Sequence, residues 1–151
     1  MAIARGAGTE IIRSTTFEDV ASTPVPLIIG EQHHIYTVLS VILYANSVNT
    51  DGTDYCTAKL VGYDSYGGTS AQDIQIFRWL SMTDYNTFVF NDKFSFTGFE
   101  PTDYAGAMDD ATKQNAMADQ GSSVAQKFYI YTNHASTVVD GVCTYIDQNN
   151  A

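Results

Sequence analysis

The alternation of apolar and polar residues predicts β-strands along most of the chain. The strongest signal is His33–Ala45, where successive side chains of a strand point to opposite faces. One face would carry Ile35, Thr37, Leu39, Val41 and Leu43, and the other Tyr36, Val38, Ser40, Ile42 and Tyr44. Both faces are largely apolar, so we expect this strand to be covered on both sides. The core would cover one face, and a neighbouring subunit is a candidate for the other.

Shorter alternating stretches, separated by turn residues, predict further strands. They span Thr9–Phe17, Tyr55–Tyr63, Asp73–Leu80, Thr87–Phe90, Lys93–Phe99, Lys127–Asn133 and Thr137–Ile146. Pro24 and Pro26 restrict the segment around them to a sheet edge or a turn. About eight strands at such intervals predict an all-β fold, an antiparallel two-sheet β-sandwich for which a jelly roll is one possible topology.

Two segments depart from this pattern. Residues 1–13 are predicted to be a flexible N-terminal arm, because their first eight residues are mostly small and bury little surface. Residues 14–151 would form the β-sandwich domain, interrupted by an acidic excursion at residues 100–123. Within the excursion, the composition favours a helical turn around Asp109–Met117.

The net charge of the chain limits the classes of partner that it can bind. The chain has a net charge of −10, which repels nucleic acid and anionic membranes, so we expect neither to bind. Arg5 and Arg13 make the arm mildly basic, which suits docking onto an acidic protein surface. No apolar run is long enough for a signal-peptide core or a membrane span, so we expect synthesis and assembly in a cytoplasm.

Catalytic and metal-binding patterns are missing from the sequence. The adjacent His33 and His34 would point to opposite faces of a strand, and no nucleophile motif accompanies them. Cys56 and Cys143 are expected to be buried thiols. The acids of the Asp51–Asp54 turn and of the excursion could hold calcium, but they lack the spacing of an EF-hand loop, so solvated loop acids are the preferred interpretation. The sequence therefore predicts a protein without enzymatic activity, cofactor or metal.

The aromatic residues are too numerous for one core, since 13% of the chain is Phe, Trp or Tyr. Tyrosine and tryptophan supply large rigid contact areas with a polar tip, which favours interfaces. The predicted interface aromatics are Tyr36, Tyr55, Tyr63, Trp79 and Tyr129. The main alternative is a carbohydrate-binding or receptor-binding module, in which Trp79, Tyr66 and Tyr104 would stack on sugars.

The order of these features resembles a known class of proteins. An N-terminal arm precedes the strand Ile35–Leu43, and the strand Lys59–Tyr63, the stretch Phe88–Phe94 and the closing strand Val142–Ile146 follow. This order is similar to that in small β-sandwich proteins that decorate or cement the capsids of tailed bacteriophages. The acidic excursion departs from the simple pattern of that class.

The resemblance implies a structural protein on the capsid surface of a virion, bound to neighbouring major capsid subunits. It also implies a homo-oligomer, with a trimer favoured. The arm residues expected to contact the capsid are Ile3, Arg5, Ile11, Ile12 and Arg13. A tail or fibre component of the same virion is a further alternative.

Overall fold

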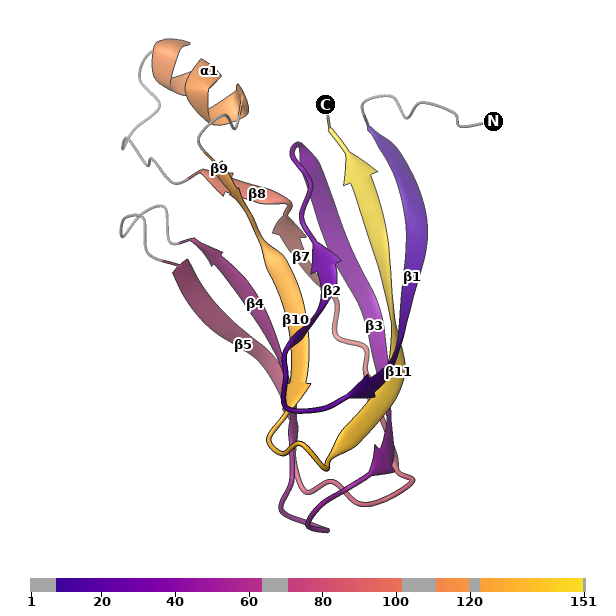
Figure 1. Cartoon of the computed structure of the whole chain (residues 1–151). Helices are drawn as coiled ribbons and strands as arrows, with labels where there is room; N and C mark the ends of the chain where they lie inside the picture. Colours follow the sequence, from indigo (N-terminus) through magenta and orange to yellow (C-terminus); the bar gives the residue numbers. More distant parts are fainter. Residues whose placement is uncertain (1–7, 64–70, 102–110, 120–122, 151) are drawn as a thin grey trace.

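A computed structural model of the chain describes residues 8–63, 71–101, 111–119 and 123–150. Two antiparallel β-sheets pack face to face (Figure 1). The five-stranded sheet consists of β1 (Thr9–Val20), β11 (Val138–Asn149), β3 (His34–Ser47), β6 (Thr87–Phe90) and β7 (Phe94–Thr97). The four-stranded sheet consists of β2 (Val25–Ile29), β10 (Lys127–Thr132), β4 (Cys56–Tyr63) and β5 (Ala71–Trp79).

The strand order is that of a jelly roll. Both β6 and β7 pair with β3, one after the other along the same side, so together they occupy one strand position. The order is then β1-β11-β3-β6/β7 in one sheet and β2-β10-β4-β5 in the other. Consecutive strand positions thus alternate between the sheets, except that β4 and β5 pair in the same sheet, as in the double Greek key of jelly rolls. The predicted antiparallel two-sheet β-sandwich is confirmed.

A short excursion separates β7 from β10. It contains the pair β8 (Phe99–Pro101) and β9 (Ser123–Ala125), with α1 (Ala111–Asp119) between them in the chain. Figure 1 shows these three elements beyond one end of the four-stranded sheet. The helix α1 overlaps the predicted helical turn and begins two residues later than expected.

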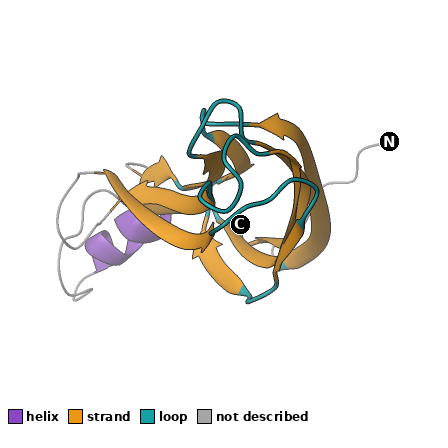
Figure 2. Cartoon of the chain, turned by 90° about the horizontal axis from the view of Figure 1, so that it is seen from below, coloured by secondary structure: helices purple, strands orange, loops and turns teal. Residues whose placement is uncertain are grey.

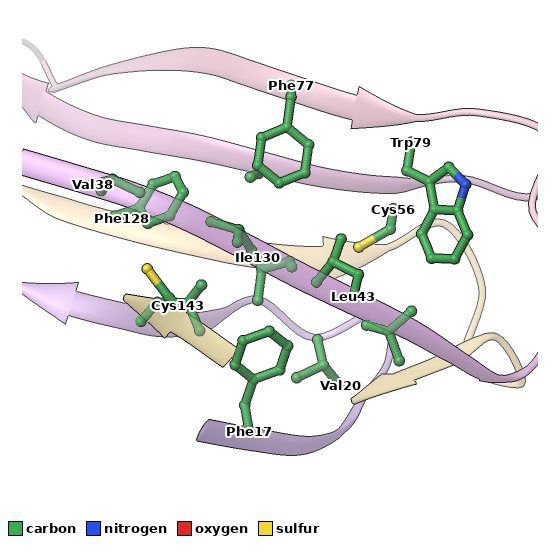
Figure 3. Close-up of a cluster of buried hydrophobic side chains, with 14 of the residues drawn as sticks. Phe17, Val20, Val38, Leu43, Cys56, Phe77, Trp79, Phe128, Ile130 and Cys143 are labelled. Atoms are coloured by element: carbon green, nitrogen blue, oxygen red, sulfur yellow. The ribbon is translucent and has the colours of Figure 1, made fainter. Parts of the chain in front are cut away.

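The core lies between the two sheets (Figure 3). The five-stranded sheet contributes Phe17, Val20, Val38, Leu43 and Cys143, and the four-stranded sheet contributes Cys56, Phe77, Trp79, Phe128 and Ile130. In β10, Phe128 and Ile130 are buried while the residues between and after them are partly exposed, which is the simple alternation that the sequence predicts. Stacked and edge-on aromatic rings fill the space around β6 and β7.

A β-bulge in β3 makes the predicted division of its faces wrong. The ladder with β11 pairs Ser40 with Thr144 and Val38 with Tyr145, which leaves Leu39 without an opposite residue. An extra residue reverses the alternation beyond it. The buried face is therefore formed by Tyr36, Val38, Val41, Leu43 and Ala45, and the outer face by Ile35, Thr37, Ser40, Ile42 and Tyr44.

The first strand corrects the predicted arm boundary. Residues 9–13 belong to β1 and pair in register with β11, from Thr9 opposite Asn149 to Arg13 opposite Tyr145. A ladder to a strand at the other end of the chain holds them in place, as the strand prediction for Thr9–Phe17 had indicated. The sequence analysis also treated the segment around Pro26 as an edge or a turn, and the structure shows that it contains the edge strand β2.

Candidate functional site

The outer face of the five-stranded sheet, here called the neutral face, is the most distinctive surface of the molecule. It is formed by Ile12, Ser14, Thr16, Ile35, Thr37, Ser40, Ile42, Tyr44, Thr87, Val89, Ser95, Thr97, Val142, Thr144 and Ile146. Directly opposite residues in a ladder share a face of the sheet, so the pairing places these side chains together. None of these residues carries a charge, while the same ladders place the acids Glu10 and Asp140 at the ends of the face.

Aliphatic side chains form rows across the strands of the neutral face. Val142 lies opposite Ile42, and Ile42 lies opposite Val89, so one row crosses β11, β3 and β6. In a second row, Ile12 lies opposite Ile146. Ile12 is 71% exposed and Val89 is 52% exposed. Large aliphatic side chains at such exposure, grouped on one face, mark a surface that gains free energy when a partner covers it.

Hydroxyl groups of the neutral face form hydrogen bonds with one another. The Ser14 and Thr144 hydroxyl oxygens are 3.2 Å apart, and those of Thr37 and Ser95 are 3.0 Å apart. A partner can therefore cover the face without leaving these hydroxyl groups buried and unsatisfied. Along the same strands, the charged residues Glu10 and Asp140 lie at opposite ends of the face.

No other element covers the neutral face within the described ranges. Figures 1 and 2 show the five-stranded sheet as one wall of the sandwich, with β8, β9 and α1 projecting from the other sheet. The two apolar faces of this strand predicted a cover on both sides. The structure places one face of β3 in the core and leaves the other at the surface.

The predicted arm contacts fall in different places. Ile3 and Arg5 lie outside the described residues. Ile12 is on the neutral face, whereas Ile11 and Arg13 point to the inner side of β1, opposite Asp147 and Tyr145. The Arg13 Nε atom donates a hydrogen bond to the Asp147 carboxylate over 3.0 Å. A ladder and an ion pair thus hold Ile11 and Arg13 in β1, and their contact with a capsid stays a prediction.

Two of the predicted interface aromatics belong to the core. Tyr36 is 2% exposed and its hydroxyl accepts a hydrogen bond from the Glu31 N–H; burial raises the pKa of Tyr36 to about 12. Trp79 stacks on Phe88 with ring centroids 5.5 Å apart and is also buried. Apolar surroundings between the sheets hold both rings, so neither is available to a partner.

The remaining three aromatics are spread over the four-stranded sheet. Tyr129 is on its outer face, opposite Lys59. Tyr55 precedes β4 and lies under the Arg78 guanidinium, 4.2 Å from its central carbon. Tyr63 ends β4, and its side chain lies outside the described part. The five aromatic residues predicted to form an interface therefore do not lie together on one face.

Asp54 forms a buried polar centre that the sequence analysis missed. Its carboxylate is 4% exposed and accepts hydrogen bonds from the Thr137 hydroxyl, the Thr50 N–H at 3.0 Å and the Asn133 amide at 3.1 Å. Burial alone would raise the pKa of Asp54, but these hydrogen bonds outweigh it and lower the pKa. Interpreting Asp54 as a solvated loop acid was therefore wrong.

The two cysteines are placed unfavourably for nucleophilic chemistry. Cys56 and Cys143 are free and buried, as expected, and burial raises the pKa of each thiol to about 12. Among the described residues, no three His, Cys, Asp or Glu side chains are grouped closely enough to hold a metal ion. No helix in those same ranges has the length and apolar character needed to cross a membrane.

Comparisons with known proteins describe likenesses of architecture. No protein-family model matches the chain, and no curated protein sequence matches it. A solved chain of the disulfide-linked pili of Bacillus endospore appendages is 12% identical, covers 100% of this chain and 97% of its own, and has a TM-score of 0.43. A chain of the T13 particle of the virus IBDV is 7% identical over 99% of this chain and 33% of its own, with a TM-score of 0.46. A chain of the naturally empty cowpea mosaic virus particle is 10% identical over 95% of this chain and 87% of its own, with a TM-score of 0.39.

Proposed function

We propose that this protein is a structural subunit of a virion, which decorates or cements the outer surface of a capsid by binding neighbouring major capsid subunits. The observation that carries the proposal is the neutral face. In a chain of net charge −10, the middle of this sheet face carries no charged side chain, and the acids Glu10 and Asp140 lie at its ends. Such a surface is suited to contact with another protein. The sequence resemblance to capsid decoration proteins gives the proposed partner its identity.

The size of the neutral face supports a protein partner. Four strand positions about 4.8 Å apart, over about eight residues of 3.3 Å each, present a projected area of about 500 Å². A standard specific interface takes about 800 Å² from each partner. The face supplies most of that area on a rigid scaffold.

The carbohydrate-binding alternative loses its central residue. Jelly rolls occur in lectins as well as in capsids, so the fold does not separate the two functions. A sugar-stacking platform needs an exposed ring, and Trp79 is buried against Phe88. The other two predicted platform residues, Tyr66 and Tyr104, lie outside the described ranges.

Charging the neutral face is expected to abolish particle binding without unfolding the protein. In an Ile42→Lys/Val89→Lys variant, two ammonium groups would be buried against the partner, and affinity should fall at least about tenfold. The measurement is co-sedimentation of purified protein with virions assembled without it. The matched control is Ile74→Lys, since Ile74 is 57% exposed on β5, in the other sheet.

Wild-type protein and the Ile74→Lys control should pellet equally with the virions. Circular dichroism checks that the double variant remains folded, and the single Val89→Lys variant provides a milder test. Equal pelleting of wild type and a folded double variant would refute the proposed contact.

Removing residues 1–7 is expected to weaken particle binding while stability is retained. These residues directly precede β1, and Ile3 and Arg5 remain the proposed arm contacts. Removing residues 1–13 instead would delete the start of a strand that pairs with β11, and should lower the melting temperature. Virion co-sedimentation and thermal unfolding of both truncations check this, and unchanged binding of the shorter truncation would exclude an anchoring role for the arm.

A further inference from the structure

The outer face of the four-stranded sheet is basic, although the chain is strongly acidic. Lys59, Arg78, Lys127, Tyr129 and Tyr131 define this surface, here called the basic face. The ladders place Tyr129 opposite Lys59, and Thr57 opposite both Tyr131 and Arg78. Three of the seven Lys and Arg residues of the chain therefore gather on one sheet face. Asp73 is the acid nearest to them on β5.

Aromatic rings and hydrogen bonds order the cations of the basic face. The Lys59 Nζ atom lies 3.0 Å from an Asp73 carboxylate oxygen and 5.3 Å from the centre of the Tyr131 ring. Arg78 donates from Nε to the Thr57 hydroxyl over 3.0 Å and covers the Tyr55 ring. Lys127 lies between Ile29 and Val61 on the neighbouring strands. With Asp73 included, the face keeps a positive charge held in fixed positions.

The opposite charge is concentrated at one end of the sandwich, where β1 and β3 finish and β6 and β11 begin. We call this the acidic end; its acids at the surface are Glu18, Asp19, Asp51, Asp84 and Asp140. The segments that form it, residues 17–22, 45–55, 80–87 and 133–141, contain no Lys or Arg. The two surfaces adjoin at Tyr55, whose ring Arg78 covers, so one chain carries a basic face and an acidic end of complementary charge.

We propose that the basic face binds the acidic end of a second copy of this chain. Two copies with a net charge of −10 each repel one another in most orientations. The contact between the basic face and an acidic end replaces that repulsion by attraction, which selects this orientation. Tyr129 and Tyr131 supply rigid contact area beside the cations.

The contact is heterologous, because it joins different surfaces of the two copies. Heterologous contacts close into rings or continue as open chains, according to the rotation between subunits. Such self-association goes beyond the proposed capsid contact and uses the opposite wall of the sandwich. The trimer expected from the sequence resemblance is one ring that this contact can form.

A charge-swap experiment tests the contact. A face variant carries Arg78→Glu and Lys127→Glu, and an end variant carries Glu18→Lys and Asp51→Lys. Light scattering coupled to size exclusion measures mass at about 0.1 mM protein, above the micromolar Kd of a modest interface. Wild type should exceed the 16.5 kDa of one chain and dissociate between about 0.05 M and about 0.5 M NaCl. Each variant alone should be a monomer, and an equimolar mixture should form a complex.

Two further variants keep the test decisive. Lys127→Glu alone leaves the contacts of Arg78 intact, and should still weaken association if the double variant folds poorly. Lys93→Glu makes the same charge change in the loop between β6 and β7, and should associate as wild type does. Monomeric wild type at low salt, or a mixture that forms no complex, would overturn the proposal. If the Ile42→Lys/Val89→Lys variant lost self-association while the face variant kept it, the contact between copies would lie on the neutral face, and the proposal would be wrong.

Discussion

Replacing Asp54 with alanine is expected to destabilise the fold by about 3 kcal/mol, since three buried or half-buried donors lose their acceptor. The Thr137 hydroxyl, the Thr50 N–H and the Asn133 amide all point at this one carboxylate. They come from the loop after β3 and from the connection between β10 and β11. Asp54 therefore joins the two sheets at their shared end.

Urea unfolding followed by tryptophan fluorescence measures the loss. Asp54→Asn is the conservative comparison, because it keeps an acceptor oxygen but removes the charge, and should cost about half as much. Asp51→Ala is the matched control, because Asp51 is exposed in the same turn. A change below about 0.5 kcal/mol for Asp54→Ala would place it among ordinary surface substitutions and contradict the assigned role.

The lowered pKa of Asp54 also predicts the direction of a pH effect. The folded state binds this proton more weakly than the unfolded state does, so the carboxylate contributes stability above its ordinary pKa, near pH 4. That contribution is lost as the pH falls through the lower pKa of the folded state. Wild type should thus lose stability in acid more steeply than Asp54→Asn, and parallel curves would contradict this linkage.

Replacing Phe128 with alanine is expected to cost about 4 kcal/mol, the range of large-to-small substitutions in a close-packed core. Phe128 is fully buried, and its ring meets the edge of Phe94 from the opposite sheet at 5.3 Å between centroids. Its ladder neighbours are Leu60 and Ile28, so truncation opens a cavity in the centre of the four-stranded sheet. Figure 3 shows this ring between the sheets.

Chemical denaturation again provides the measurement for Phe128→Ala, and Val89→Ala on the neutral face is the control. Val89 is 52% exposed, so its truncation should change stability by less than about 0.5 kcal/mol. Similar losses in the two variants would mean that the interior is packed differently from the structure described above.

Local patterns predicted the strands well, and non-local contacts explain what the patterns missed. Phe128 and Ile130 alternate with partly exposed tyrosines, so the sequence predicted which side chains of this strand point to the core. The faces of β3 were not, because the bulge at Leu39 depends on its pairing with β11. No local signal brings Arg13 beside Tyr145, since that ladder joins the two ends of the chain.

The candidate surfaces were predictable to different degrees. Two apolar faces on one strand predicted a cover on both sides; the core covers one face, and a partner on the other stays a prediction. The gathering of Lys59, Arg78 and Lys127 was not visible, because each comes from a different strand of the four-stranded sheet. The burial of Asp54 was equally hidden, since a turn of the type Asp-Gly-Thr-Asp normally lies in solvent.

The most direct test of the central claim is the position of this protein in the virion, determined by electron cryomicroscopy at side-chain resolution. We expect a decorated capsid on which Ile42 and Val89 lie in van der Waals contact with a major capsid subunit. A virion in which the neutral face is open to solvent while the protein is held by other surfaces would contradict it.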